Sequence, residues 1–259
     1  MNTLLIDAGN SSLKWAVLKK DGSLTTQEKV FYADKTPLQC FENLINKQSQ
    51  QCNALLMVSV LGSDFAKNVE ALTAKASMQF YSVKSQKKLA GLKNAYAEPH
   101  KLGADRFVAM IAAYHLGNKE ACIVIDAGTA TTIDAIDANG QHLGGLILPG
   151  IQLCSSSLLE NTALLPLWNK DDETFTPELF SKETSQAIAS ASVIGLAGAI
   201  ESICSKMANE LLVDSSQPIK RILCGGDAEA ILPFMESDYE HQKDLLMIGL
   251  KTIAQLKRI

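Results

Sequence analysis

The chain has 259 residues, of which 47% are hydrophobic and 20% are charged, and its formal net charge is −4. This is the composition of a globular protein with room for two domains of about 100–150 residues, and the lack of a basic block argues against a nucleic-acid partner. No signal peptide is expected at the start and no apolar run approaches the ~20 residues of a membrane span, which predicts a cytoplasmic protein without a membrane partner.

The first part of the chain has an α/β pattern. A short aliphatic strand ends at Asp7, and Ala8-Gly9 lets the backbone turn into a second strand. A third strand, a helix, a buried strand and a second helix follow. The corresponding ranges are strands 3–7 and 13–18, a turn at 19–23, a helix at 38–48, a strand at 54–60 and a helix from Ser63. Three antiparallel strands followed by strand–helix alternation are typical of an α/β domain.

A polar stretch over residues 84–105 then predicts a long loop, and long loops inside compact domains tend to be functional. It ends in Gly103-Ala104-Asp105-Arg106, from which a helix continues to Gly117. One interpretation is a plain helix N-terminus, where the macrodipole favours Asp105 and Arg106 is solvated. The other is a functional pair, with a carboxylate that accepts a proton and a guanidinium that holds an anion.

The second part starts with another Asp-Gly turn. Three strands (121–126, 131–137 and 142–148) precede a long helix at 185–212 that is rich in alanine, serine and glycine, a strand ending in Gly225-Gly226, and a last helix capped by Asp244. Small residues allow close approach, so we expect the long helix to pack against another helix or a second subunit. Gly225-Gly226 is either a plain turn or bare backbone on which an adenine can lie.

The two Asp-Gly turns form an internal repeat. Leu4-Leu5-Ile6-Asp7-Ala8-Gly9 resembles Ile123-Val124-Ile125-Asp126-Ala127-Gly128, and the aspartates are 126 − 7 = 119 residues apart. A repeat of this length predicts two similar domains, at 1–117 and 118–259, that face each other across a central cleft. Each turn is either a tight hairpin or an anion-binding concavity of backbone N–H groups beside an aspartate that holds a hydrated metal ion.

Four motifs, taken in order, resemble the type III pantothenate kinase family over essentially the whole chain. They are Asp7-x-Gly9-Asn10-Ser11-x-x-Lys14, Gly103-Ala104-Asp105-Arg106, Asp126-x-Gly128-Thr129-Ala130-x-Thr132 and Gly144-Gly145-x-Ile147-x-Pro149-Gly150. The resemblance implies duplicated ribonuclease-H-like domains of the actin, Hsp70 and sugar-kinase superfamily. It also implies phosphorylation of pantothenate with ATP, the first step of coenzyme A synthesis, by a homodimer that needs Mg²⁺ and a monovalent cation, K⁺ or NH₄⁺.

The resemblance also implies roles for individual residues. Asp105 would be the catalytic proton acceptor, and the pantothenate contacts would be Tyr96, Gly103, Ala104, Asp105, Arg106 and Thr184. ATP and its phosphates would lie against Asp7, Ala8, Gly9, Asn10, Ser11, Ser12, Leu13, Lys14, Thr129, Gly225 and Gly226. Asp126 would hold the monovalent cation, and Asp7 would hold Mg²⁺ through water. The sequence departs from the family at Ser11-Ser12, where Thr and Asn are frequent, but serine keeps the hydroxyl group and the small size.

Two alternatives stay open at this point. One is a regulatory member of the same fold that binds nucleotide without turnover and would lack the acidic base. The other is a different small-molecule kinase or a phosphatase of the superfamily, since only Tyr96 and the Gly103–Arg106 segment favour pantothenate. An assay that compares pantothenate with sugars and acetate separates these functions.

Overall fold

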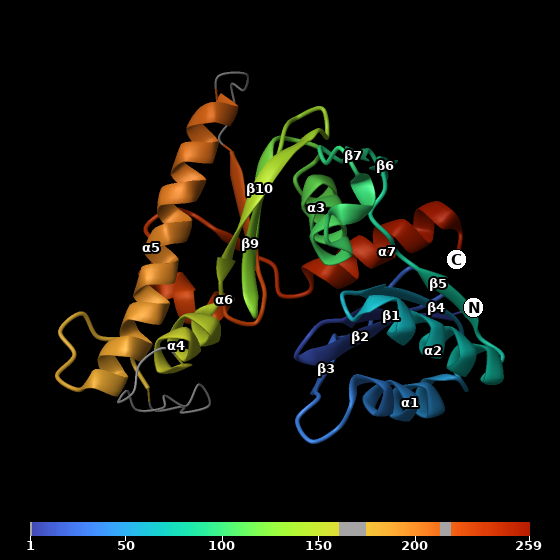
Figure 1. The fold of residues 1–259 in the computed structure, drawn as a ribbon. Helices are drawn as coiled ribbons and strands as arrows, with labels where there is room; N and C mark the ends of the chain where they lie inside the picture. The colour runs from blue at the N-terminus through green and yellow to red at the C-terminus, as the bar shows by residue number, and fades with distance from the viewer. Residues whose placement is uncertain (1, 161–174, 213–218) are drawn as a thin grey trace. The chain divides into compact units, whose positions relative to one another are not determined.

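The computed structural model describes residues 2–160, 175–212 and 219–259, which form two compact units. Unit 1 contains residues 1–118 and 244–259, and unit 2 contains residues 119–243. Figure 1 labels most of the helices and strands of both units.

Unit 1 is built on a five-stranded sheet of order β3-β2-β1-β4-β5. The strands are β1 (Asn2–Ala8), β2 (Ser12–Leu18), β3 (Glu28–Phe31), β4 (Cys52–Ser59) and β5 (Gln79–Ser82). The first three are antiparallel neighbours, whereas β4 and β5 run parallel to β1. Because side chains alternate between the two faces of a strand, the continuous apolar run of β1 predicts a sheet covered on both sides.

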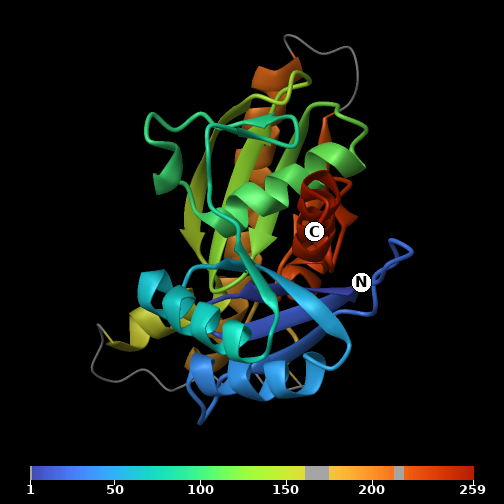
Figure 2. The ribbon, with the colours of Figure 1, turned by 90° about the vertical axis from the view of Figure 1, so that its right-hand side faces the viewer.

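Helices cover both faces of this sheet (Figures 1 and 2). One face packs on α1 (Pro37–Gln48) and α2 (Gly62–Lys75), through a core that includes Leu4, Ile6, Leu55, Phe41 and Val69. The other face contacts α3 (Ala104–Leu116) and α7 (Leu245–Lys257). A small hairpin of β6 (Lys88–Leu89) and β7 (Leu92–Lys93) and a 3₁₀ turn η1 (Pro99–Lys101) lie in the segment before α3.

Unit 2 repeats this sheet with the order β10-β9-β8-β11-β12. The strands are β8 (Cys122–Ala127), β9 (Ala130–Ile136), β10 (His142–Pro149), β11 (Lys220–Cys224) and β12 (Glu240–His241). As in unit 1, a three-stranded antiparallel meander is followed by two strands parallel to its first strand. The repeat seen in the sequence is therefore a repeat of the whole sheet topology.

One face of the second sheet packs on a long helix. The helices are α4 (Ile151–Glu160), α5 (Thr184–Leu212) and α6 (Ala228–Ile231), which is followed by the 3₁₀ turn η2 (Leu232–Phe234). Within the part of the chain that the structure describes, α5 alone is long and apolar enough to cross a membrane, in contrast to the expectation from the sequence. Half of its most apolar window is buried, because Val193, Leu196, Ala197 and Ile200 belong to the core of unit 2.

The two units differ from the predicted domains, which divide between residues 117 and 118, mainly in the placement of one helix. The first boundary lies one residue further on, after Asn118, but the last helix, α7, clusters with unit 1 and not with unit 2. Helix α7 packs along α3 and contacts β1, and its core-facing residues Leu245, Leu250 and Ile253 are fully buried. The apolar period of this helix predicts a buried face but carries no information about which sheet the face covers.

Candidate active site

The first Asp-Gly turn joins β1 to β2 and is closed by backbone hydrogen bonds. The Gly9 N–H donates to the Ser12 carbonyl at 3.1 Å, while Asn10 and Ser11 are exposed. The hydroxyl of Tyr32 donates to the Gly9 carbonyl at 2.9 Å, and the Tyr32 N–H donates to the Ser11 carbonyl at 3.2 Å. Tyr32 therefore holds the turn from both ends and leaves its tip open to a ligand.

A buried aspartate and a lysine lie at the base of this turn. Asp7 is opposite Lys14 in the β1–β2 register, and the Lys14 Nζ is 3.6 Å from the Asp7 carboxylate. Asp7 is only 7% exposed. Burial, with a further contribution from the charge of Asp7, raises the pKa of the Tyr32 hydroxyl, which therefore stays protonated and able to donate. The position suits Lys14 for a phosphate contact, because an ammonium group acts there as a point charge.

The second turn joins β8 to β9 and is packed between two glycines. A Cβ on Gly225, whose φ is +99°, would lie 2.2 Å from the Ala127 carbonyl oxygen. A Cβ on Gly150 would lie 2.0 Å from the Gly128 carbonyl oxygen. Since real Cβ atoms do not come so close, both positions require glycine, and the turn is held in place from both sides. Gly225 thus has a packing role in addition to any contact with a nucleotide.

The donor set at the second turn fits a cation that is shared with phosphate oxygens. Asp126 occupies the position of Asp7, but its register partner on β9 is the neutral Thr132 where unit 1 has Lys14. Among residues 2–160, 175–212 and 219–259, no three His, Cys, Asp or Glu side chains form a metal-binding group. One carboxylate together with phosphate oxygens and water is how Mg²⁺ is usually held at nucleotide sites, so the residues fit a nucleotide-borne cation.

The Gly103–Arg106 motif forms the first turn of α3. The Oδ1 atom of Asp105 accepts a hydrogen bond from the Arg106 N–H at 2.8 Å. A Cβ on Gly103 would lie 2.6 Å from this oxygen, so glycine gives the carboxylate room to fold back over the helix N-terminus. Asp105 therefore lies at the N-terminus of the helix, and this position keeps its half-buried carboxylate at a fixed place.

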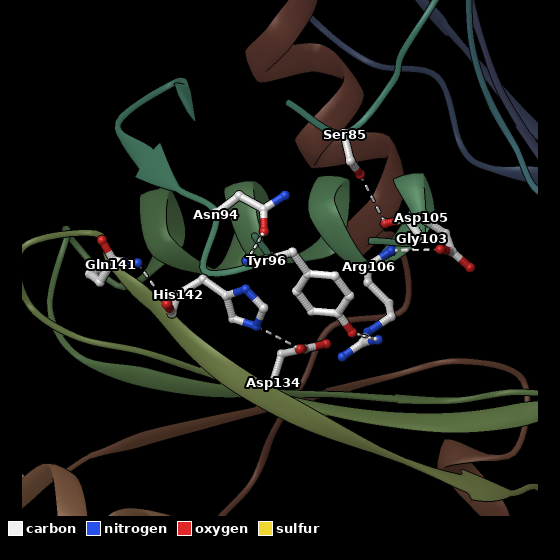
Figure 3. Close-up of polar contacts among 9 residues, drawn as sticks. All are labelled: Ser85, Asn94, Tyr96, Gly103, Asp105, Arg106, Asp134, Gln141 and His142. Atoms are coloured by element: carbon white, nitrogen blue, oxygen red, sulfur yellow. Dashed lines mark hydrogen bonds and ion pairs between the residues drawn. The ribbon is translucent and has the colours of Figure 1, made fainter. Parts of the chain in front are cut away.

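Arg106 is not the solvated side chain of the plain helix interpretation, because it is only 6% exposed. Its Nη1 donates to the hydroxyl of Tyr96 at 3.2 Å, and its guanidinium carbon lies 6.0 Å from the Tyr96 ring centre. In Figure 3 the Arg106 side chain extends towards Tyr96, whereas the Asp105 carboxylate turns back to the Arg106 backbone. The structure thus brings Tyr96, Gly103, Asp105 and Arg106 together, and their contact with the substrate stays a prediction.

The other predicted site residues lie in unit 2. Thr184 is the first residue of α5, and its side chain is exposed. Thr129 is also exposed, and its carbonyl accepts from the Gly150 N–H at 3.1 Å. Directly after Gly226, the Asp227 N–H donates to the Ala127 carbonyl at 2.8 Å, which ties the Gly225-Gly226 turn to the turn between β8 and β9. The contacts of these residues with pantothenate and ATP stay predictions.

Sequence reasoning missed two residues, Tyr32 at the first turn and His142 at the start of β10. Tyr32 was hidden because the register between β2 and β3 spans the irregular residues 19–27 and cannot be read locally. His142 is completely buried, and its Nε2 lies 3.0 Å from the Asp134 carboxylate on the neighbouring strand (Figure 3). A histidine and an aspartate on adjacent strands are a usable signal only once the β9–β10 pairing is known.

Solved structures show which class of protein this duplicated fold defines. The chain resembles a conserved Baf family protein from Campylobacter jejuni with a TM-score of 0.61 and 21% identity, over 98% of each chain. It also resembles the ethanolamine utilization protein EutJ from Carboxydothermus hydrogenoformans, with a TM-score of 0.54 and 15% identity over 98% of this chain and 89% of that one. The predicted fold class, an α/β protein with two similar domains, is confirmed.

Sequence comparison then identifies the family. Residues 3–206 match the type III pantothenate kinase family. A type III pantothenate kinase of Janthinobacterium sp. (strain Marseille) is 34% identical over 97% of this chain and 96% of the relative, and that of Nitrosococcus oceani is 31% identical over 97% and 93%. The chain belongs to the type III pantothenate kinase family. The predicted enzyme class and activity, phosphorylation of pantothenate in coenzyme A synthesis, are thereby confirmed.

Proposed function

We propose that this chain transfers the γ-phosphoryl group of ATP to the primary hydroxyl of pantothenate, with Asp105 as the proton acceptor. The observation that carries this proposal is the first turn of α3, where a fixed carboxylate and a buried guanidinium face different partners. Phosphoryl transfer proceeds through a loose transition state, so it needs alignment and charge neutralisation more than covalent chemistry. A carboxylate within reach of the attacking hydroxyl supplies general-base catalysis.

Arg106 would bind the carboxylate of pantothenate. A guanidinium has a planar fork of donors that matches a carboxylate, and Tyr96 already limits the orientations that this fork can adopt. Withdrawal of Arg106 from water strengthens such a contact, since a buried charge gains from a partner. The base and the anion anchor are neighbours in the sequence, so one rigid helix end would align both ends of the substrate.

The two turns would hold the phosphates of ATP. Backbone N–H groups at Gly9-Asn10-Ser11 and at Gly128-Thr129 offer anion-binding concavities, and Lys14 adds a positive charge beside Asp7. A hydrated Mg²⁺ at Asp7 and a monovalent cation at Asp126 would neutralise the triphosphate when they are bound.

We also propose a cytoplasmic homodimer. Exposed small residues form a stripe along α5, namely Ala187, Ala191, Gly195, Gly198 and Ser202, opposite the core-facing side of the helix. A Cβ added at Gly195 or Gly198 would meet nothing within 4 Å, so this stripe is open to a partner. The edge strand β10 adds exposed apolar side chains, with Leu146 49% and Ile147 60% exposed.

A coupled assay that follows ADP release tests the proposed reaction. Pantothenate should support turnover with ATP and Mg²⁺, whereas acetate and hexoses at the same concentration should not. A chain that binds ATP but turns over none of these substrates would be the non-catalytic member of the fold, and preferential turnover of a sugar would transfer the function to another kinase class.

A further inference from the structure

One buried asparagine shapes the loop that carries Tyr96. Asn94 is 1% exposed, and its carboxamide bonds to the loop backbone in two directions. The Oδ1 atom accepts from the Tyr96 N–H at 2.9 Å, as drawn in Figure 3. The Nδ2 atom donates to the Pro99 carbonyl at 3.1 Å. A single side chain thus joins two backbone groups on either side of the loop and satisfies one donor and one acceptor.

Asn94 itself is fixed by contacts that do not involve its side chain. Its N–H donates to the Lys87 carbonyl at 2.9 Å, and the Lys87 Nζ donates to the Asn94 carbonyl at 3.3 Å. Leu92 and Leu102, on either side of the loop, are 0% and 2% exposed. The backbone of Asn94 is therefore fixed by neighbouring residues of unit 1, and its side chain in turn fixes the backbone of Tyr96.

The far end of the loop is held separately. The Ser85 Oγ donates to the Gly103 carbonyl at 3.2 Å, and Ser85 is 7% exposed (Figure 3). This bond fixes Gly103, two residues before Asp105, but does not involve Tyr96. The two buried polar side chains therefore fix different parts of the loop: Asn94 fixes the Tyr96 end, and Ser85 fixes the α3 end.

We propose that Asn94 is a positioning residue for pantothenate, which acts by holding Tyr96 against Arg106 before the substrate arrives. This inference rests on the proposed function of Tyr96 and Arg106. A loop that is already in its binding conformation loses less conformational entropy when pantothenate binds, so the affinity of the enzyme for pantothenate is higher. Asparagine suits the position because alanine has neither hydrogen-bonding group, and aspartate has the acceptor but no amide donor for Pro99.

The test compares Asn94→Ala with Asn68→Ala, which changes an exposed asparagine on α2. In Asn94→Ala the KM for pantothenate should rise at least 10-fold, while the KM for ATP stays within twofold. Asn68→Ala should leave both constants unchanged. A folded Asn94→Ala enzyme whose pantothenate KM stays within twofold of the wild type would overturn the proposal. If Asn94→Ala does not fold, Asn94→Asp applies the same test, with at least a fivefold rise expected and the same overturning result.

A double-mutant cycle separates positioning through Tyr96 from a general effect on the fold. In a Tyr96→Ala background, Asn94→Ala should raise the pantothenate KM by less than a further threefold. The same 10-fold or larger rise in both backgrounds would show that Asn94 does not act through Tyr96, and would refute the proposal.

Hydrogen exchange tests the loop without reference to the substrate. Amide exchange in residues 95–103 should be at least 10-fold faster in Asn94→Ala, and exchange in the body of α3 should stay within twofold. Unchanged loop exchange would overturn the positioning role even in an active enzyme. Failure of wild-type protein to phosphorylate pantothenate would instead refute the proposed function, and the exchange result would still decide whether Asn94 orders the loop.

Discussion

At the scale of single residues, the site depends on two neighbours that point to different partners. Successive residues of a helix are separated by about 100° around its axis, because a turn contains 3.6 residues. Asp105 therefore bends back over the N-terminus of α3, while Arg106 extends to Tyr96. The sequence predicted this pair, but its burial and its link to Tyr96 needed the structure, since Tyr96 is ten residues away across an irregular loop.

Asp105→Asn should abolish turnover and leave the fold intact. Asparagine keeps an oxygen that can accept the Arg106 N–H and is a good residue at helix N-termini, so stability should change by less than ~1 kcal/mol. It has no carboxylate to accept the proton of the pantothenate hydroxyl, and loss of a general base typically lowers the rate by ~10²–10⁴. The measurements are kcat at saturating substrates, ATP binding by calorimetry and thermal unfolding. Activity above about a tenth of wild type would place the base elsewhere, with Asp7 as the next candidate.

Asp126 predicts activation by monovalent cations. With pantothenate and ATP saturating, replacement of K⁺ by tetramethylammonium at constant ionic strength should depress turnover, because the bulky ion does not fit beside a carboxylate and phosphate oxygens. Asp126→Asn should be slow in both salts. The control is Asp64→Asn, which alters an exposed carboxylate on α2 and should retain the wild-type response. Equal wild-type rates in the two salts would remove the role assigned to Asp126.

At the scale of elements, local patterns predicted much of the architecture. The aliphatic runs ending at Asp7 and Asp126 are the first strands of both sheets, and the repeat between them is a repeat of topology. Long-range partners were not readable in the same way. The packing of α7 on α3 and the hydrogen bonds from Tyr32 to the first turn depend on chain segments that meet only after folding.

Gly225→Ala should both destabilise unit 2 and disturb the second turn. The new Cβ would collide with the backbone of Ala127, and alanine is strained at a φ of +99°. Conformational strain of this kind costs ~1–3 kcal/mol, and overpacking adds to it. Gly128→Ala, in the second turn itself, is a matched control, because its Cβ would make only ordinary contacts, the nearest at 3.7 Å. Chemical denaturation should therefore show a clearly lower stability for Gly225→Ala than for Gly128→Ala. Equal stabilities would mean that the turn has room to move away from Gly225.

At the scale of the whole molecule, the exposed face of α5 connects the fold to the proposed dimer. A 29-residue helix with an uncharged first half would ordinarily need apolar surroundings on all sides. Its core-facing side includes the aliphatic side chains of Val193, Leu196 and Ile200, whereas the exposed positions between Ala187 and Ser202 are alanine, glycine and serine. Small side chains bury little area against water, but they allow another backbone to approach closely, which is what a helix interface requires.

The protein should therefore be a dimer of 2 × 27.9 = 55.8 kDa by light scattering at micromolar concentration. Ala191→Arg places a long charged side chain in the middle of the exposed stripe and should shift the mass towards a single chain. Ala71→Arg, which makes the same change on the exposed face of α2 in unit 1, should leave the dimer intact. Circular dichroism should show that both variants keep the native helix content, since neither alanine is buried. A wild-type mass of 27.9 kDa would refute the dimer itself, and a dimeric Ala191→Arg would move the interface away from α5, leaving the exposed edge of β10 as the surface to test next.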